Sequence, residues 1–344
     1  MPSAADRSNL SVVIIGRNEG DRLRRALDSV ADCGSLIVYV DSQSTDGSVP
    51  LARSMGAVVV ELEPTQRPSA ARARNLGFEK AREIAPQLEA VQFLDGDCEL
   101  AGDWLDRAAE VLETRPEVAV VCGRLRERFP ERSVYNRLAD LEWNLPTGEV
   151  SACGGVAMIR ARAFQAAGGF DPTIIAAEDD ELCLRIRSGG WKVLRLDEVM
   201  GTHDMAMTRF RQWWRRSVRT GHAYAEGSSL HGRSPERHFV RQTRSTIFWG
   251  LVLPVLALGL AWPTRGLSLL LAGGYLVLYL KTRRYYERQR AWPRGDASLY
   301  AAWIVLAKFP QAVGLVRYWA GRFLGKRSDV IEHRVGSDRT QSIG

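Results

Sequence analysis

The sequence predicts an α/β fold, with a mostly parallel sheet flanked by helices, followed by a C-terminal helical region associated with a membrane. Three observations carry this prediction. Apolar stretches of strand length alternate with helix-patterned stretches over residues 10–206. Residues 1–204 contain 24 Lys and Arg against 33 Asp and Glu, whereas residues 205–334 contain 22 against 6. Uncharged stretches of 15 residues or more lie in the basic part alone, so we expect the two parts in different environments.

The strands and helices of the first part alternate in a regular order. Apolar stretches rich in β-branched residues predict buried strands, at 10–16, 36–40, 57–62, 91–94, 118–122, 193–196 and 199–202. Apolar residues at helical spacing predict helices, at 21–30, 46–55, 70–84 and 104–114. Ligands of such open sheets bind beyond the carboxyl ends of the strands. Asp41 and Asp95 each end a strand, so we expect both acids at one crevice.

Three polar segments of this part carry candidate chemistry. Asp95 and Asp97 follow a strand and flank one glycine, a spacing that suits Mg²⁺ or Mn²⁺, although Asp-Gly is also an ordinary turn. Residues 41–48 (DSQSTDGS) form either a phosphate-binding loop or a capped turn. Arg72 and Arg74 either face a diphosphate or are solvated charges of a helix.

Four consecutive acids stand at residues 178–181, close after the glycine pairs at 154–155 and 168–169. In the first turn of a helix, such acids are favoured by the macrodipole. On a helix Glu181 can pair with Arg185 at i,i+4, which leaves Asp179 and Asp180 available. A carboxylate buried near other carboxylates has a raised pKa and can serve as a general base.

In this order, the motifs resemble those of the family 2 glycosyltransferases, which have the Rossmann-like GT-A fold. The matching segments span residues 10–204: 12–19 (VVIIGRNE), 41–48, 73–77 (ARNLG), 94–97 (LDGD), 156–170 ending in GGF, and 178–185 (EDDELCLR). One departure is that Gln43 and Ser44 stand where many members carry a further acid. The resemblance implies transfer of a sugar, with inversion, from a nucleotide sugar to an acceptor hydroxyl.

The resemblance also implies roles for single residues. Asn18, Glu19 and Asp41, with Arg74 and Asp95, are expected at the nucleotide. Asp97 and Asp95 are expected at a divalent metal, and Asp179 is expected to be the catalytic base. His203 follows the last strand and is a third metal ligand, a phosphate donor or a structural histidine. Contacts to the acceptor or the diphosphate are expected from Gly154, Gly155 and Glu178.

The segment 207–242 is rich in Arg and Trp. It loosely resembles the basic, Trp-containing motif that closes the site in membrane-bound sugar-polymer synthases of this family. By that resemblance, Arg209, Trp213 and Arg215 are expected at the diphosphate or the acceptor. The alternative is an interfacial helix on an anionic phospholipid bilayer, with Arg among the headgroups and Trp at the boundary.

Two uncharged stretches, 247–262 and 266–280, are 16 and 15 residues long, somewhat short of the roughly 20 that span a bilayer. They are apolar on all sides, and basic residues flank the pair on both outer ends. This pattern predicts a transmembrane helical hairpin over 243–282 with both ends in the cytoplasm. A buried core hairpin is the alternative.

A third apolar stretch, 297–324, is interrupted by Lys308, Pro310 and two arginines. Charges at mid-helix are costly in a bilayer, so the pattern predicts amphipathic interfacial helices within 283–334, broken near Pro310. A third membrane span is the alternative. The tails, 1–9 and 335–344, carry no signal-peptide pattern and no regular structure is expected there.

These features predict a membrane-anchored enzyme whose catalytic domain, residues 10–206, faces the cytoplasm at the cell inner membrane. A lipid-linked or growing glycan is the expected acceptor, in polysaccharide or glycolipid biosynthesis, because a soluble acceptor gives no reason for an anchor. No nucleic-acid partner is expected. The rival hypotheses are a sugar nucleotidyltransferase and a non-catalytic membrane scaffold. The five cysteines form no CxxC pair and are interpreted as reduced core thiols.

Overall fold

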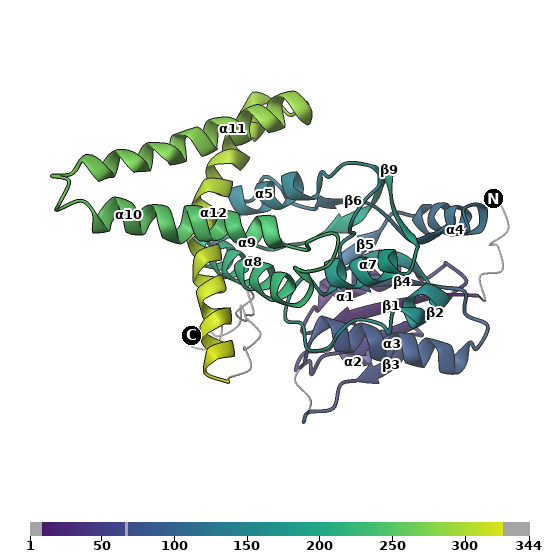
Figure 1. Ribbon diagram of the computed structural model, residues 1–344. Coiled ribbons are helices and arrows are strands. Elements are labelled where there is room, and N and C mark those ends of the chain that lie inside the picture. Colours follow the sequence, from purple (N-terminus) through teal and green to yellow (C-terminus); the bar gives the residue numbers. More distant parts are fainter. Residues whose placement is uncertain (1–8, 66–67, 326–344) are drawn as a thin grey trace, which may run out of the picture. The chain divides into compact units, whose positions relative to one another are not determined.

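The structure is a computed structural model that describes residues 9–65 and 68–325 (Figure 1). Within these residues the chain divides into two compact units. The α/β unit comprises residues up to 131, 142–174 and 178–206, and the helical unit comprises 132–141, 175–177 and the residues from 207 on. Apart from Asn9, the expected tails lie outside the described residues.

The α/β unit is built on one mixed sheet with nine strands. In chain order the strands are β1 Leu10–Gly16, β2 Leu36–Asp41, β3 Val58–Glu61, β4 Ala90–Asp95, β5 Cys98–Leu100, β6 Val118–Glu127, β7 Gly148–Glu149, β8 Ala157–Arg160 and β9 Lys192–His203. Their order in the sheet is β3-β2-β1-β4-β8-β6-β9-β5, and β7 pairs with β9. The prediction of an α/β fold with a sheet and flanking helices is confirmed.

The strand register brings two of the predicted site residues to the same edge of the sheet. β1 runs parallel to β2 on one side and to β4 on the other. Gly16 is opposite Asp41, and Ile15 is opposite Asp95. Both acids therefore flank the end of β1, as expected for carboxyl ends of parallel strands.

Some strands could not be read from the sequence pattern. β8 is only four residues long and runs antiparallel between β4 and β6. The two strands predicted between 193 and 202 are a single strand, β9, that pairs with β6 through register shifts. Short antiparallel insertions carry too few residues for a periodicity, which explains why β8 was missed.

Six helices flank the sheet in the α/β unit: α1 Asp21–Asp28, α2 Ser48–Ser54, α3 Ala70–Ile84, α4 Trp104–Thr114, α6 Ala161–Ala166 and α7 Glu178–Ser188. α3 and α4 begin and end where the sequence predicts. Ser69 starts α3, since its hydroxyl accepts a hydrogen bond from the Arg72 backbone N–H.

The helical unit contains most of α5 and all helices after the sheet: α5 Val134–Trp143, α8 Phe210–His231, α9 Val240–Ile247, the π-helical turn η1 Phe248–Val252, α10 Leu253–Gly259, the 3₁₀ helix η2 Leu267–Ala272, α11 Gly273–Gln289 and α12 Arg294–Phe323. α8 and α12 touch through their backbones. A Cβ on Gly314 would collide with the Val218 carbonyl, and one on Gly221 with the Gln311 carbonyl. Small residues at these positions allow this close packing.

The segments predicted as a membrane hairpin are helical. η1 precedes Pro254, which has no N–H to donate to the Gly250 carbonyl. α11 lies beside η1, because the Tyr275 hydroxyl donates to the Trp249 carbonyl at 2.6 Å. That these helices cross a membrane stays a prediction.

The prediction of helices broken near Pro310 is wrong. α12 is one helix of 30 residues with Pro310 inside it. A proline removes one backbone hydrogen bond, and close contacts hold the helix on both sides of that position, with η1 at Lys308 and with α8 at Gln311 and Gly314. Among the described helices, only α12 is long and apolar enough to cross a membrane. Its length and composition fit the alternative of a third span.

Candidate active site

The loops after β1 and β2 are tied together by polar side chains. The buried Asp41 carboxylate accepts hydrogen bonds from the Tyr39 hydroxyl at 2.9 Å and from the Ser44 backbone N–H at 2.7 Å. The Asn18 side-chain oxygen accepts from the Thr45 backbone N–H at 2.7 Å, and the Asn18 N–H donates to Ser44 Oγ at 2.9 Å. These bonds form a polar rim at the carboxyl edge of the sheet.

Two further residues define this rim. Burial, and then the Asp41 charge, raise the pKa of Tyr39 above its usual range, so its hydroxyl remains a neutral donor to Asp41. Glu19 pairs with Arg22 at 2.8 Å, and its side chain packs over Gly16 and Gly96.

A cluster of possible metal ligands lies where β5 meets β9. His203 Nε2 is 3.0 Å from Asp97 Oδ2, and Cys98 Sγ is 3.6 Å from Asp97 Oδ1. The Trp143 ring packs on the His203 ring at 4.8 Å between centroids. A carboxylate oxygen, an imidazole nitrogen and a thiol sulfur thus lie within 4.8 Å of one another. This donor set fits a divalent cation.

Asp95 has a different partner from Asp97. Its Oδ1 accepts a hydrogen bond from Arg74 Nη2 at 2.8 Å. The structure therefore brings Asp97 and His203 together, as expected, and pairs Asp95 with a guanidinium.

Arg74 joins the end of β4 to the start of α7. Its buried guanidinium donates from Nη1 to Glu178 at 2.9 Å and from Nη2 to Asp95 at 2.8 Å. A Cβ at residue 155 would collide with Nη2, so any larger residue there would displace the guanidinium. The Phe170 ring faces the guanidinium at 5.4 Å. The sequence predicted that Arg74 contacts the nucleotide, whereas here two carboxylates already pair with it.

The acids at 178–181 form the first turn of α7, and their side chains have different neighbours. Glu181 pairs with Arg185, with 2.6 Å between Oε2 and Nη2, as the i,i+4 spacing predicts. Burial, and then the Glu178 charge, raise the pKa of Asp179 to about 6, while Arg74 opposes that rise. An acid with such a pKa can accept a proton near neutral pH.

Asp180 is set apart from Asp179 by its neighbours. Its pKa is also raised well above its usual value, by burial and then by the Asp179 and Glu178 charges. The cations that oppose this rise are Arg187 and Arg195, and Arg74 is the cation that acts on Asp179. Asp179 therefore belongs to the Arg74 side of α7, where Gly154 also lies, with its Cβ position 4.0 Å from Asp179 Oδ2.

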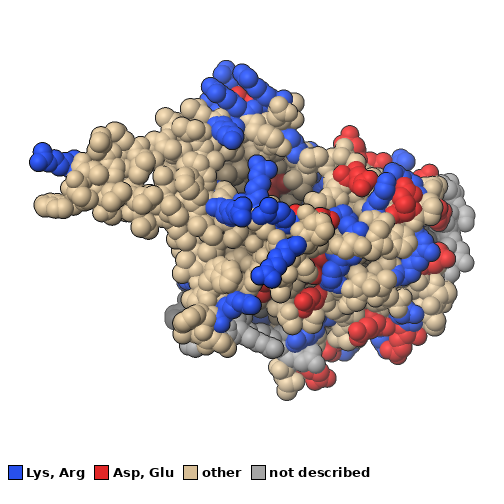
Figure 2. Space-filling view, viewed as in Figure 1, with Lys and Arg blue, Asp and Glu red and all other residues tan. Residues whose placement is uncertain are grey.

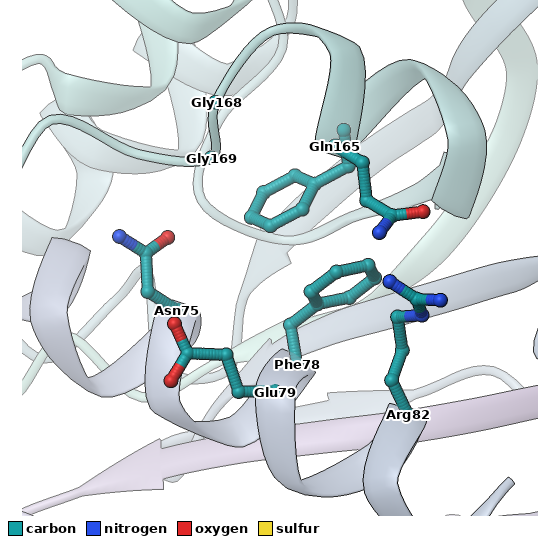
Figure 3. Close-up of a pocket in the computed structure, with 8 residues that line it drawn as sticks. Asn75, Phe78, Glu79, Arg82, Gln165, Gly168 and Gly169 are labelled. Carbon is teal, nitrogen blue, oxygen red and sulfur yellow. The ribbon is translucent and has the colours of Figure 1, made fainter. Parts of the chain in front are cut away.

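A pocket of about 380 Å³ lies on another part of the α/β unit (Figure 3). Asn75, Glu79 and Arg82 project from α3 on one side, and Gln165 and the turn after α6 form the other (Figure 3). The Asn75 amide donates to the Phe170 carbonyl and accepts from the Phe170 N–H. The pocket is thus closed at one end by a structural contact, and none of the predicted site residues lines it.

The remaining predicted residues belong to the helical unit. Arg209 is the N-cap residue of α8, and its backbone N–H donates to the Gln212 side-chain oxygen at 2.9 Å. The Trp213 ring is buried against Trp303, with 4.6 Å between ring centroids. Arg215 is partly exposed on α8.

Sequence reasoning missed Cys98, Tyr39 and Asn75. Cys98 had one available signal, since it directly follows Asp97. Its pairing with His203 across two strands has no local signal. The same is true of the bonds from Asn75 to Phe170, which is 95 residues away.

The chain was compared with known proteins. Residues 11–167 match the model of the glycosyl transferase family 2. A pre-mycofactocin glycosyltransferase of Mycobacterium tuberculosis is 28% identical over 246 residues, 67% of this chain and 50% of that protein. The glycosyltransferase AglE of Haloferax volcanii is 24% identical over 56% of this chain and 66% of its own length. The chain thus spans about half to two thirds of these relatives.

One solved structure resembles the chain over most of its length. The structure is that of the mannosyltransferase PcManGT from Pyrobaculum calidifontis in complex with GDP-Man and Mn²⁺. The match covers 88% of each chain, with a TM-score of 0.57 and 24% identity. At this identity the likeness shows the fold. The family match over residues 11–167 and this likeness confirm the resemblance found in the sequence: these residues are similar to glycosyl transferase family 2, and the fold is that of GT-A.

Proposed function

We propose that the protein transfers a sugar from a nucleotide sugar, with inversion, to a lipid-linked or growing glycan at the cytoplasmic leaflet of the inner membrane. One observation carries the proposal. A single buried guanidinium, that of Arg74, bonds both Asp95, next to the cation cluster, and Glu178, next to Asp179. A metal-binding motif and a candidate base are thereby held in one site of the α/β unit.

An inverting displacement needs a base for the incoming hydroxyl and a stabilised leaving group. Asp179, with a pKa of about 6, takes the proton of the acceptor hydroxyl as that oxygen attacks the anomeric carbon. The sugar–phosphate bond breaks, and the nucleoside diphosphate leaves. Asp97 and His203 would hold a divalent cation, Mg²⁺ or Mn²⁺, which supplies charge stabilisation for the diphosphate.

The donor site is proposed at the polar rim formed by Asn18, Glu19 and Asp41. Asn18 bonds the loop after β2, so a base or ribose bound there would meet a fixed set of polar groups. The Pyrobaculum neighbour was solved with GDP-Man and Mn²⁺, which supports a nucleotide sugar and a divalent cation here. Gly154, which is exposed beside Asp179, leaves room for the acceptor hydroxyl.

Membrane anchoring is proposed from the surface of the helical unit. Of 25 large apolar side chains that are exposed among the described residues, 22 lie after Asp204. They include Leu258, Trp262 and Leu270, which are 70%, 93% and 74% exposed. Such a surface is stable in contact with lipid, and Arg209 and Arg215 can then face anionic headgroups.

The direct test uses the full chain in detergent with a panel of nucleotide sugars. Released nucleoside diphosphate is measured with Mg²⁺, with Mn²⁺ and with a chelator. We expect release with one donor class, loss of release in chelator, and loss in Asp97→Asn, which should stay folded. Formation of pyrophosphate from a sugar phosphate and a nucleoside triphosphate would instead indicate a nucleotidyltransferase. Donor binding without any turnover would indicate a scaffold.

Membrane topology needs a separate experiment. Reporters fused after residues 204 and 334 should both report cytoplasm if 243–282 is a hairpin. A protein that purifies as a soluble monomer without detergent would contradict the anchor and leave the transfer reaction standing.

A further inference from the structure

The cluster at β5 and β9 contains a sulfur atom that a site for Mg²⁺ does not need. Cys98 stands directly opposite His203 in the antiparallel pair of β5 and β9. Residues directly opposite each other project to the same face of a sheet. Cys98 Sγ therefore lies on the side of His203, and it is 3.6 Å from the Asp97 carboxylate.

The spacing of the three donor atoms suits one ion. Metal bonds of about 2.0–2.3 Å in a tetrahedral arrangement place neighbouring ligand atoms roughly 3.4–3.7 Å apart. The two oxygens of the Asp97 carboxylate face different partners: Oδ2 is 3.0 Å from His203 Nε2, and Oδ1 is 3.6 Å from Cys98 Sγ. One donor atom from each of the three residues lies within 4.8 Å of the other two. In the part of the chain that the structure describes, this is the one His, Cys, Asp and Glu group with such spacing.

We propose that Cys98 is a third protein ligand of this site, which makes it a site for a cation of the zinc class. The inference deepens the proposed function, on which it rests only for the location of the cation, and it replaces the Mg²⁺ or Mn²⁺ named there by a cation that accepts a sulfur ligand. Mg²⁺ takes oxygen ligands in an octahedral arrangement, whereas imidazole and thiolate donors favour Zn²⁺ and similar cations. Asp97, Cys98 and His203 then bind such a cation before any nucleotide sugar arrives, and the fourth position is left for the diphosphate.

The environment of the cluster supports this assignment. Asp97 and Cys98 are buried, and only 14% of the His203 side chain is exposed. The Trp143 ring covers one face of the imidazole, and the Asp204 N–H fixes the Asp97 backbone carbonyl at 2.9 Å. A ligand set held in this way needs little reorganisation when the ion enters.

Cadmium binding tests the proposal without any turnover. Cd²⁺ bound to a thiolate gives a sulfur-to-metal charge-transfer band in the ultraviolet. A pair of thiols elsewhere in the chain, Cys153 and Cys183 with 3.4 Å between the sulfur atoms, could bind Cd²⁺ as well. The experiment therefore starts from full-length Cys153→Ser, in detergent and freed of metal, and titrates Cd²⁺ in the absence of nucleotide sugar.

We expect Cys153→Ser to keep the band, and the double variant Cys153→Ser/Cys98→Ser to lose it. Affinity for Cd²⁺ should fall at least about tenfold in the double variant and in Cys153→Ser/His203→Gln, as it does when a metal site loses even an outer partner. An unchanged band without Cys98, or unchanged affinity without His203, overturns the proposal. If Cys98→Ser does not fold, the His203→Gln arm still decides, because a sulfur band that weakens when His203 is changed comes from a thiolate at the His203 site, and a band that stays unchanged overturns the proposal.

The two proposals fail separately. If the cadmium band disappears in Cys98→Ser and no donor gives nucleoside diphosphate, the metal-site proposal stands and the transferase proposal fails. If nucleoside diphosphate is released and the band is unchanged in Cys98→Ser, the transferase proposal stands and the metal-site proposal fails.

Discussion

The α/β unit and the helical unit differ in where their charged and apolar side chains lie. The α/β unit buries charged groups and pairs them, as Arg74 does with Asp95 and Glu178. The helical unit carries most of the excess positive charge and exposes apolar side chains, and few charged atoms cover α10 and the first half of α11 in Figure 2. The first unit has a polar network beside its large hydrophobic core, and in the second α8 and α12 meet in close backbone contacts such as that at Gly314.

The proposed reaction therefore belongs to the α/β unit, and the proposed membrane contact belongs to the helical unit. Buried carboxylates cost stability unless they are paired, and the proposed function gives those beside the strand edge a role in the reaction. Exposed leucines cost stability in water, which is why we propose that α10 and α11 contact lipid. Each prediction below alters one unit in a way that should leave the other unchanged.

The largest effect is expected from Asp179→Asn. The amide has nearly the same shape as the carboxylate but cannot take a proton from the acceptor. Turnover should fall at least about a hundredfold, since loss of a positioned base costs about 10²–10⁴ in rate. Affinity for the nucleoside diphosphate should change little. Both quantities come from steady-state kinetics and a binding titration on the same preparation.

Asp180→Asn is the matched control. Asp180 is influenced by Arg187 and Arg195 on its side of α7, so its change should be much milder. If Asp180→Asn were inactive and Asp179→Asn active, the assignment would be wrong by one residue. If both stayed active, the base would lie outside α7, and the nucleotidyltransferase alternative would gain.

The second prediction concerns Arg74 and the stability of the α/β unit. Arg74→Gln leaves the buried Glu178 and the partly exposed Asp95 without their cation. Breaking a buried pair such as that with Glu178 typically costs about 3–5 kcal/mol in free energy of unfolding. Arg53→Gln is the control, because Arg53 and Glu61 form an ion pair whose side chains are 60% and 56% exposed. That control should change stability little. Denaturant unfolding followed by fluorescence compares the two, and equal losses would show that the Arg74 network is not what holds α7.

These residues also show what the sequence could predict. Local patterns sufficed for α3, α4 and the pairing of Glu181 with Arg185, because each depends on residues at most a few turns apart. The convergence of Asp41 and Asp95 followed from the geometry of parallel strands.

Contacts between distant residues could not be predicted. Arg74 and Glu178 are 104 positions apart, and Asp97 and His203 are 106 apart. Neither pair leaves a periodicity in the chain. The sequence therefore identified Arg74 as a candidate site residue without its partners, and it left Cys98 among the core thiols. Pro310 misled for a related reason, since the α8 contact that supports α12 lies far away in sequence.

The third prediction concerns the helical unit. A Cβ at residue 314 would collide with the Val218 carbonyl, so Gly314→Ala should force α8 and α12 apart. Overpacking of this kind costs about 1–3 kcal/mol. Gly295→Ala is the control in the same helix, because nothing lies within 4 Å of its Cβ position, and alanine favours helix over glycine. Thermal unfolding in detergent should separate the two variants, and identical melting temperatures would argue against close packing at Gly314.

The fourth prediction is a pH dependence of turnover. A base works only when ionised, so kcat/KM should fall as the pH drops through about 6, the pKa of Asp179. The Arg74 cation lowers that pKa and Glu178 raises it, so Arg74→Gln should move the acidic limb to higher pH. Arg74→Lys keeps the charge and should leave the limb near its original position. If neither substitution shifted the acidic limb of the kcat/KM profile, the titrating group would be one other than Asp179.

The smallest effect is a gain in stability from the same residue. The pKa of Asp179 is about 6 in the folded chain and about 3.9 when unfolded. Between these values the unfolded state gives up its proton first, so ionisation of Asp179 costs folding stability as the pH rises from about 4 to 6. Asp179→Asn removes that cost. Its melting temperature should exceed that of the parent protein at pH 7, and the difference should vanish near pH 4. A variant less stable than the parent at pH 7 would show that the Asp179 carboxylate is held by favourable bonds and not strained by burial, and its proposed pKa would then be too high.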